Sequence, residues 1–372
     1  MKIPYGKQTI NEDDISAVLK VLEENEMLTT GKYVPKFEDA ICKYIGCKHA
    51  LAVNSGTAAL HLATYAINIQ SGDEVIVPAI SFVASANCVL YQQGTPVFCD
   101  IDPNTLNIDH TKIEALITPK TKAVIMVDMC GQPCNYDEIR AICDKHNLHL
   151  IQDAAHSLGG KYKGNKVGSY SDISCLSFHP VKNITTCEGG MMVTNNEEFY
   201  KRALAFRTHG ISRDFKEREK MNSHYYDMGD LGFNYRIPDL LCALGIEQLK
   251  RLDFFIGKRN AIASTYREKL DKNEIACLDE QHYSAYHIVV VKLLHKNRDT
   301  VFKQLKEQGI IANVHYMPIY LHSYYQKLGY KKGLCPEAEK VYEQIITLPC
   351  YPLLTAEEQD YVIDTLNRIV KE

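Results

Sequence analysis

Residues 172–196 read DISCLSFHPVKNITTCEGGMMVTNN, and this stretch carries the strongest indication of the fold. Its two apolar runs predict buried strands over Ile173–Phe178 and Met191–Thr194. Between them lie a single lysine, Lys182, and the pair Gly189-Gly190. Burial lowers the pKa of a lysine and frees its amine to act as a nucleophile that forms a Schiff base. The alternative is an ordinary lysine on a solvated loop.

Similar apolar runs recur over the first 200 residues and alternate with amphipathic segments. The expected strands are Glu74–Val77, Pro96–Asp100, Ala123–Asp128, Leu148–Gln152 and the two named above. The expected helices are Ser55–Ile67, Ser85–Tyr91, Tyr136–His146 and Glu197–Phe206. Apolar strands separated by helices are typical of an α/β fold with a mostly parallel sheet that is covered on both faces.

The second half of the chain has a different pattern. Residues 211–230 are charged and aromatic without a clear period, which predicts a long loop, and one long helix is expected from Pro238 to about residue 270. The rest predicts a compact α+β domain. Its expected elements are a strand over Ala285–Leu293, a helix over Thr300–Gln308, a Tyr/His-rich loop over Asn313–Tyr325 and a helix over Ala356–Val370. We therefore expect a large domain over residues 1–250 and a small one over 251–372.

Composition restricts the class of protein. The chain has 372 residues, 45% hydrophobic and 24% charged, with a formal net charge of -4, so neither nucleic acid nor an anionic membrane is an expected partner. No apolar leader or membrane span is present, which predicts a cytoplasmic protein. The 13 cysteines are expected to be buried and reduced. Only Cys130 and Cys134 are spaced like metal ligands, without a second pair, so no metal is expected.

Three further features support a cofactor site near Lys182. Asp153 ends a predicted strand, and ligands of doubly wound sheets bind at such ends, where a carboxylate could pair with a protonated pyridine nitrogen. Gly56 and Thr57 begin a predicted helix whose amides would suit a phosphate. Ser177 ends the strand before Lys182 and could reach the same phosphate. Taken singly, Asp153 and the helix start are more often simple caps; their joint presence in this order favours the site.

These residues, with motifs along the whole chain, resemble the fold type I pyridoxal 5′-phosphate (PLP) enzymes, and among them the DegT/DnrJ/EryC1/StrS nucleotide-sugar aminotransferases. The motifs are IPYGKQTINEDDISAV, LTTGKYVPKFEDAICKYIG, NSGTAALHLA, GDEVIVPAISFVASANCVLY, DIDPNTLNID, IQDAAHSLGG, SFHPVKNITTCEGG, RTHGISRD, LGFNYRIPDLLCALG and HYMPIY. The branch that it most resembles is the 4-aminotransferase of pseudaminic acid synthesis. The resemblance implies PLP as cofactor, with pyridoxamine 5′-phosphate as its intermediate form.

The resemblance also implies roles for individual residues. Lys182 would form the Schiff base and later move protons as the general base, Asp153 would bind the pyridine nitrogen, and His156 would lie at the ring edge. Phe82 would stack on the ring face. The remaining cofactor residues would hold the phosphate, and they are Gly56, Thr57, Ser177 and, from a second subunit, Asn234. The active site would therefore be shared within a homodimer.

Substrate residues follow from the same motifs. Thr29, Thr30 and Lys32 match a segment that contacts the nucleotide-sugar, and His315 and Tyr316 match a loop near the nucleotide. A further pair of substrate candidates consists of Arg236, a diphosphate partner, and His179.

The implied reaction moves the amino group of L-glutamate to C4 of a nucleotide-linked 4-keto-6-deoxy sugar. His179 and Glu188-Gly189-Gly190 match the members that act at C4, whereas members acting at C3 mostly read S-F-Y-x-x-K and G-D-A-G. The chain departs from the pseudaminic branch in reading NSGTAAL for NSATSAL. UDP-4-keto-arabinose and dTDP-4-keto-6-deoxyglucose thus remain alternative substrates, and the nucleotide, the 2-substituent and the C6 group stay open.

Three other classes of protein fit the sequence less well. A non-catalytic binding protein on the same fold would tolerate loss of Lys182, sugar 3-dehydratases replace that lysine with histidine, and a Rossmann dehydrogenase would need a G-x-G-x-x-G motif where this chain has NSGTAAL.

Overall fold

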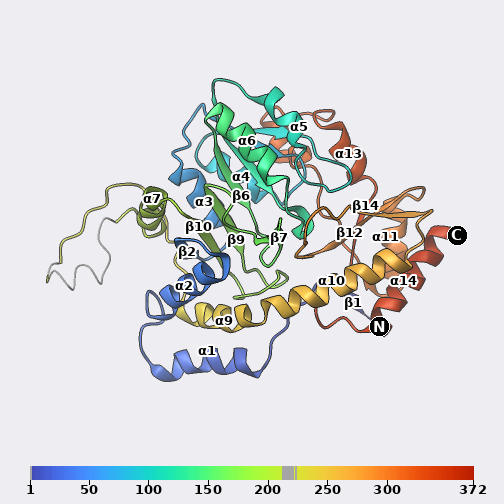
Figure 1. Cartoon of the computed structure of the whole chain (residues 1–372), viewed down its shortest axis with the longest axis horizontal. Coiled ribbons are helices and arrows are strands. Elements are labelled where there is room, and N and C mark those ends of the chain that lie inside the picture. The colour runs from blue at the N-terminus through green and yellow to red at the C-terminus, as the bar shows by residue number, and fades with distance from the viewer. Residues whose placement is uncertain (1, 212–221, 223) are drawn as a thin grey trace.

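The computed structural model describes residues 2–211, 222 and 224–372, and its centre is a seven-stranded sheet of order β2-β10-β9-β6-β5-β3-β4 (Figure 1). Its strands are β2 (His49–Val53), β3 (Glu74–Pro78), β4 (Thr95–Cys99), β5 (Thr121–Val127), β6 (His149–Asp153), β9 (Ile173–Ser177) and β10 (Gly190–Thr194). The five neighbouring strands β9, β6, β5, β3 and β4 pair in parallel, and β10 runs antiparallel to both of its neighbours, β2 and β9. The predicted mostly parallel sheet is confirmed, and β2 is an additional strand that the sequence analysis did not predict.

Helices cover both faces of this sheet. The helices of this layer are α2 (Tyr33–Ile45), α3 (Gly56–Ala66), α4 (Ala84–Tyr91), α5 (His110–Ile113), α6 (Tyr136–His146), α7 (Glu197–Arg207) and α9 (Asp239–Lys250), and α1 (Glu12–Glu24) packs on α9 from outside. Two short 3-10 turns, η1 (Glu114–Leu116) and η2 (Met129–Gly131), and the β7 (Lys161–Tyr162) and β8 (Asn165–Lys166) hairpin complete this part. The helices α1 and α2 were not predicted, although Asn11 forms a capping box with Asp14 at the start of α1.

Side chains alternate between the two faces along each strand. Leu51 and Val53 pack with α3, α4 and α7 in one buried cluster, whereas Ala50 and Ala52 pack with α2, α6 and α9 in another. A hydrogen bond and an ion pair of Glu38 also connect the edge of the sheet to α7. Glu38 of α2 accepts a hydrogen bond from the Ala52 amide at 2.9 Å and pairs with Arg207 at 2.8 Å. Burial raises the pKa of Glu38, so Arg207 is needed to keep this carboxylate charged.

The prediction of one continuous helix after Pro238 is wrong, although the segment is helical. The chain forms two helices, α9 and α10 (Leu252–Lys269), with a break at Arg251, and they lie end to end below the central sheet in Figure 1, with α1 beneath α9. Arg251 pairs with buried Asp14 of α1, a partner that local sequence cannot reveal. The position of this break lies close to the predicted domain boundary at residue 250, which itself stays a prediction.

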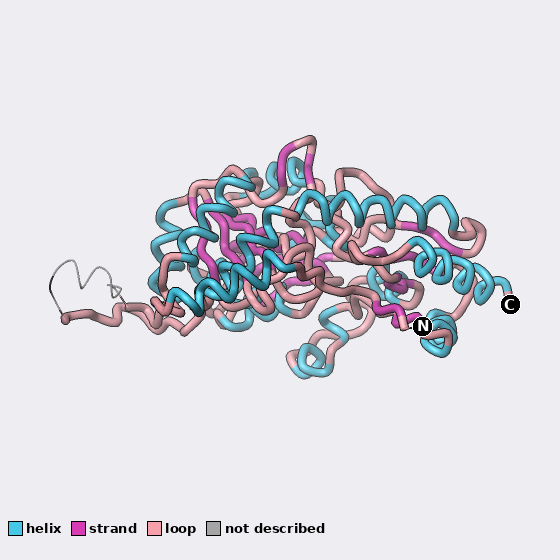
Figure 2. Tube along the Cα trace, turned by 90° about the horizontal axis from the view of Figure 1, so that it is seen from below, coloured by secondary structure: helices cyan, strands magenta, loops and turns pink. Residues whose placement is uncertain are grey.

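The C-terminal part is built on an antiparallel sheet of order β11-β12-β14, formed by β11 (Ile275–Cys277), β12 (Val289–Leu293) and β14 (Ile345–Leu348). The surrounding elements are α11 (Arg298–Glu307), η3 (Ile319–Leu321), α12 (Ser323–Lys327), α13 (Pro336–Tyr342) and α14 (Ala356–Lys371), with β1 (Ile3–Pro4) paired to β13 (Ile310–Ile311). Both termini therefore lie at the same end of the molecule (Figure 2). The expected strand over Ala285–Leu293 is shorter than predicted, and the expected loop over Asn313–Tyr325 contains two short helices.

Four further predictions concern the loop after α7, membrane spans, metal ligands and the cysteines. Residues 212–221 and 223 of the predicted loop lie outside the described residues. Within the described ranges, every helix is too short or too polar to cross a bilayer. Among the described side chains, no group of three or more His, Cys, Asp or Glu residues is arranged to hold a metal ion. All 13 cysteines are free thiols, and most of them are buried.

Candidate active site

A cavity of about 770 Å³ opens at the carboxyl ends of β6 and β9 and is closed from the other side by segments of the C-terminal part. Its position agrees with the rule that ligands of such sheets bind where the parallel strands end. Most of the residues predicted from the sequence line it, namely Gly56, Thr57, Phe82, Asp153, His156, Ser177, His179, Lys182, His315 and Tyr316. The fold thus brings together side chains that are up to 260 positions apart in the chain.

Lys182 lies on the loop between β9 and β10, in a turn closed by its amide and the His179 carbonyl at 2.9 Å. Its Nζ is 3.3 Å from Nε2 of His287. Burial lowers the pKa of Lys182 to about 8, and this effect outweighs the opposing attraction of Asp153. Roughly a tenth of this amine is therefore unprotonated at pH 7, and this is the form that a nucleophile requires.

Asp153 is the last residue of β6 and is buried beneath the cavity. Its Oδ2 accepts a hydrogen bond from the Ser85 hydroxyl at 2.7 Å, and its Oδ1 accepts one from the Ala155 amide at 3.1 Å. Burial nevertheless raises the pKa of this carboxyl, since the two bonds and Lys182 oppose it only in part. A cationic ring nitrogen placed beside Asp153 would supply the missing compensation.

The first turn of α3 faces the end of β9 across a very narrow gap. Ser55 caps the helix by accepting from the Ala58 amide at 3.1 Å, which leaves the amides of Gly56 and Thr57 without helical partners. A Cβ on Gly56 would lie 2.9 Å from Cβ of Ser177, so glycine is required for this approach. Free amides at a helix N-terminus beside a hydroxyl form a cradle for a phosphate group.

Aromatic and imidazole rings form the opposite wall. Phe82 is 54% exposed despite its size, and its ring centroid lies 6.0 Å from that of Tyr316. His156 is buried, its Nε2 is 3.5 Å from the Tyr316 hydroxyl, and burial together with Lys182 lowers its pKa well below the usual value. His315 is held by Thr347 at 2.8 Å, and burial lowers its pKa to about 3. Both rings are therefore neutral at physiological pH.

Five predicted residues do not line the cavity of this chain, and they are Thr29, Thr30, Lys32, Asn234 and Arg236. Lys32 instead pairs with Glu24 and Glu26, both at 3.1 Å. The backbone of Asn234 bridges to Thr208, and its side chain is exposed. The contribution of these residues to a site stays a prediction, and that of Asn234 depends on a second subunit.

Two residues of the site were not predicted from sequence. His287 lines the cavity just before β12, and its only sequence signal is a polar ring at the start of the apolar run HIVVV. Ser85 lies beneath the cavity in α4, where it resembles any small residue of a buried helix. In both cases the functional contact is made only by packing between distant segments.

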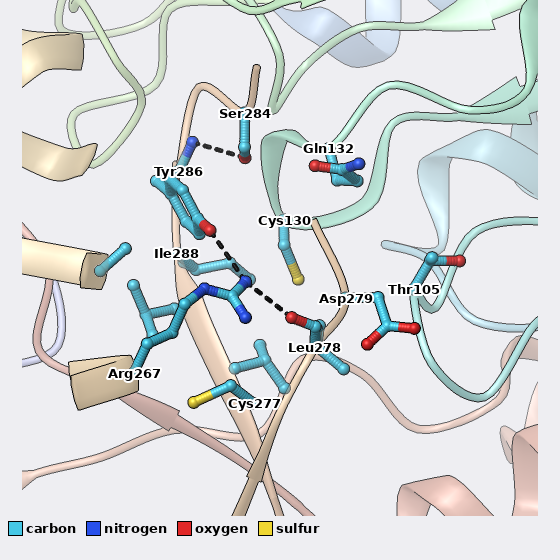
Figure 3. A pocket seen from close by; sticks show the side chains of 13 residues that line it. Thr105, Cys130, Gln132, Arg267, Cys277, Leu278, Asp279, Ser284, Tyr286 and Ile288 are labelled. Carbon is cyan, nitrogen blue, oxygen red and sulfur yellow. Dashed lines mark hydrogen bonds between the residues drawn. The ribbon is translucent and has the colours of Figure 1, made fainter. Parts of the chain in front are cut away.

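A second, much smaller pocket of about 30 Å³ lies where β11 and β12 meet the loop of η2 (Figure 3). Its main polar group is Arg267, which donates hydrogen bonds to the Leu278 carbonyl at 2.6 Å and to the Tyr286 hydroxyl at 3.1 Å. This volume suits a single water molecule, so the pocket is no substrate site.

The larger cavity fits PLP in each of its parts. A lysine with a lowered pKa suits the aldehyde, a buried carboxylate suits the ring nitrogen, and the amide cradle suits the phosphate. The fold and this site together define a fold type I PLP-dependent transferase.

Comparison with known proteins agrees with this class. The model of the DegT/DnrJ/EryC1/StrS aminotransferase family matches residues 8–367, and the chain belongs to this family of PLP-dependent sugar aminotransferases. It is 39% identical to the UDP-4-amino-4,6-dideoxy-N-acetyl-beta-L-altrosamine transaminase of Campylobacter jejuni, over 100% of this chain and 98% of the relative.

Two solved structures are similar over their whole length. One is Helicobacter pylori PseC, an aminotransferase of pseudaminic acid biosynthesis, with 34% identity, a TM-score of 0.93 and 100% of both chains covered. The other is the PLP-form of the sugar aminotransferase Spr1654 of Streptococcus pneumoniae, with 30% identity, a TM-score of 0.94, and 100% of this chain and 99% of that chain covered.

Proposed function

We propose that this protein transfers the amino group of L-glutamate to C4 of a nucleotide-linked 4-keto-6-deoxy sugar, with a UDP-linked N-acetylated sugar as the first candidate. The observation that carries the proposal is the buried Lys182 amine, with its lowered pKa, in the wall of a cavity of about 770 Å³, in a chain similar along its whole length to a transaminase named for a UDP-4-amino-4,6-dideoxy sugar. The cavity is large enough for a cofactor and part of a sugar.

The proposed roles of the cofactor residues follow from their surroundings. The Asp153 carboxylate would accept a hydrogen bond from the protonated ring nitrogen and so keep it charged. Ser85 orients that carboxylate by donating a 2.7 Å hydrogen bond to it. The amides of Gly56 and Thr57 and the Ser177 hydroxyl bind the phosphate. Phe82 supplies a flat apolar surface for the ring, and this explains why so large a side chain is left exposed to the cavity.

When bound, PLP supplies an aldehyde for amines and a ring that withdraws electrons from the carbon next to the nitrogen. Lys182 would act as the group that removes the α-proton of the donor and gives a proton back, because its lowered pKa lets it serve as both base and acid near neutral pH. In the second half of the cycle the same amine moves protons in the reverse order at C4 of the sugar. His156, neutral in its buried position, lies at the ring edge without competing for that proton.

One of the remaining roles requires a second copy of the chain. In the proposed homodimer, Asn234 of one subunit reaches the cofactor phosphate in the partner's site, and Arg236 pairs with the diphosphate of the substrate. Thr29, Thr30, Lys32, His179, His315 and Tyr316 contact the nucleotide-sugar. The cytoplasm, where nucleotide-sugars are made, is the proposed location.

Alternative substrates differ only in the sugar and the nucleotide. UDP-4-keto-arabinose and dTDP-4-keto-6-deoxyglucose present the same ketone at C4 and would use the same residues. His179 and Glu188 line the cavity, and they belong to the motif that favours C4 over C3.

The test is an absorbance titration followed by a substrate panel. The purified holoenzyme is expected to show an absorption band of the lysine-bound cofactor, which L-glutamate bleaches, and then to aminate one of several UDP- and dTDP-4-ketosugars. Lys182→Ala is the control that removes the base. A wild-type rate of sugar amination by Lys182→Ala would refute the proposal.

A further inference from the structure

His287 has no role in the reaction proposed above, yet its ring is in contact with the Lys182 amine. Its Nε2 lies 3.3 Å from Nζ of Lys182, within hydrogen-bonding distance, and the ring is only 3% exposed. The ring of His156 packs against it with centroids 4.5 Å apart. A buried imidazole in contact with a reactive amine can control how that amine is oriented.

The surroundings of His287 keep its ring neutral. Burial lowers the pKa of His287 well below its usual value, and the titratable groups that face it, Lys182, His156, Arg259 and His315, act in the same direction. A neutral ring that accepts a hydrogen bond at Nε2 carries its proton on Nδ1, and Nδ1 has no partner among the residues that the structure describes. The ring thus leaves one buried nitrogen unsatisfied while the other faces Lys182.

The backbone that carries His287 is fixed from two sides. Buried Arg259 of α10 donates hydrogen bonds to the His287 carbonyl at 2.9 Å and to the Cys350 carbonyl at 2.8 Å. On the other side, the Ala285 amide donates to the Gly131 carbonyl at 2.9 Å, and a Cβ on Gly131 would lie 2.7 Å from the Tyr286 amide nitrogen. These contacts hold the C-terminal part against the large sheet at the level of the lysine.

We propose that His287 is a positioning residue for Lys182, whose amine donates one N–H to Nε2 of His287 whenever that amine is not bonded to the cofactor. An amine that donates an N–H to His287 keeps its lone pair directed elsewhere, into the cavity where the substrate proton must be collected. The hydrogen bond also limits the rotation of a long side chain, which matters because small misplacements of a base are costly. This inference rests on the proposed function for its catalytic meaning, but the hydrogen bond itself can be tested without catalysis.

The first test uses the cofactor-free protein. The rate at which acetic anhydride acetylates Lys182, followed by mass spectrometry from pH 6 to pH 10, gives the pKa of the amine. His287→Leu removes the acceptor that stabilises the ammonium form, so the pKa should fall by about one unit. His287→Asn retains an acceptor oxygen and should stay near the wild-type value. An unchanged pKa in a folded His287→Leu protein would overturn the proposal.

The second test follows a single half-reaction of the holoenzyme. Bleaching of the cofactor band by L-glutamate should slow by roughly 10–100-fold in His287→Leu, with a larger isotope effect for 2-deuterated glutamate, and should recover in part in His287→Asn. His61→Asn is the matched control, since His61 is equally buried but bonds to Tyr235 and Gln92. If the wild-type band did not respond to glutamate, the proposed function would fail while the acetylation result still stood.

A third measurement needs no variant at the site. The ¹H–¹⁵N spectrum of the cofactor-free wild-type protein at pH 7 should show His287 as a neutral ring protonated on Nδ1. A ring protonated on Nε2, or on both nitrogens, would overturn the proposal.

Discussion

Replacing Gly56 by alanine tests the phosphate cradle with a single added methyl group. Gly56 is the first residue of α3, where alanine is a favourable helix residue, so the backbone itself tolerates the change. The new Cβ would lie 2.9 Å from Cβ and 3.2 Å from Oγ of Ser177, and the two segments must therefore separate. Overpacking of this kind costs about 1–3 kcal/mol.

This cost should appear mainly as lost cofactor affinity. The cofactor-free protein can relieve the contact by moving α3 away from β9, whereas a bound phosphate needs both groups in place. At 1.4 kcal/mol for each factor of ten, the dissociation constant of PLP should rise by roughly 5–150-fold. The assay is a fluorescence titration of the cofactor-free protein with PLP.

The matched control is Gly257→Ala in α10, where an added Cβ meets no atom within 4 Å. This variant should bind PLP like the wild type and melt at the same or a slightly higher temperature. Wild-type affinity in Gly56→Ala would refute the assignment of the cradle, as would an equal loss of affinity in both variants.

Three further predictions concern charge. Ser85→Ala removes the 2.7 Å hydrogen bond to Asp153, and since a bond to a charged group contributes about 1.5–3 kcal/mol, the glutamate half-reaction should slow by roughly 10–100-fold in stopped-flow measurements. The pKa of Lys182 falls from 10.5 to about 8 on folding, so between these pH values the unfolded chain binds a proton that the folded chain has lost. The unfolding free energy of the cofactor-free wild type, measured relative to Lys182→Met, should therefore rise by about 3 kcal/mol from pH 8 to pH 10.5. A difference between the two proteins that stays constant with pH would contradict this. Arg207→Met leaves Glu38 unpaired and should lower the unfolding free energy in urea by about 3 kcal/mol, whereas Asp39→Asn, which breaks the exposed pair with Lys43, should change it by less than about 1 kcal/mol.

The sequence predicts the centre of this site well because its chemistry is encoded locally. Asp153, Ser177 and Lys182 each stand at or just beyond the end of an apolar strand, and strand ends of a parallel sheet meet at one edge. The helix start at Gly56 has the same local character, since Ser55 is a good N-cap. For these residues, the order of elements alone determines where they lie.

The residues that the sequence did not reveal depend on packing over long distances. His287 reaches Lys182 only because Arg259 and Gly131 fix the segment in front of β12, and neither contact leaves a pattern near His287. The break between α9 and α10 has no glycine or proline to mark it. Edge strand β2 was missed because its run HALAV is short and lies among helical segments.

The placement of β2 beside β10 has a consequence for how the protein is made. Gly56 follows β2 and Ser177 ends β9, so the two halves of the phosphate cradle are separated by 121 residues and meet only after β10 has entered the sheet between their strands. A chain emerging from the ribosome cannot retain the cofactor until residues 190–194 have been synthesised and have paired. Binding of PLP to the growing chain would therefore show that β10 has paired with both β2 and β9.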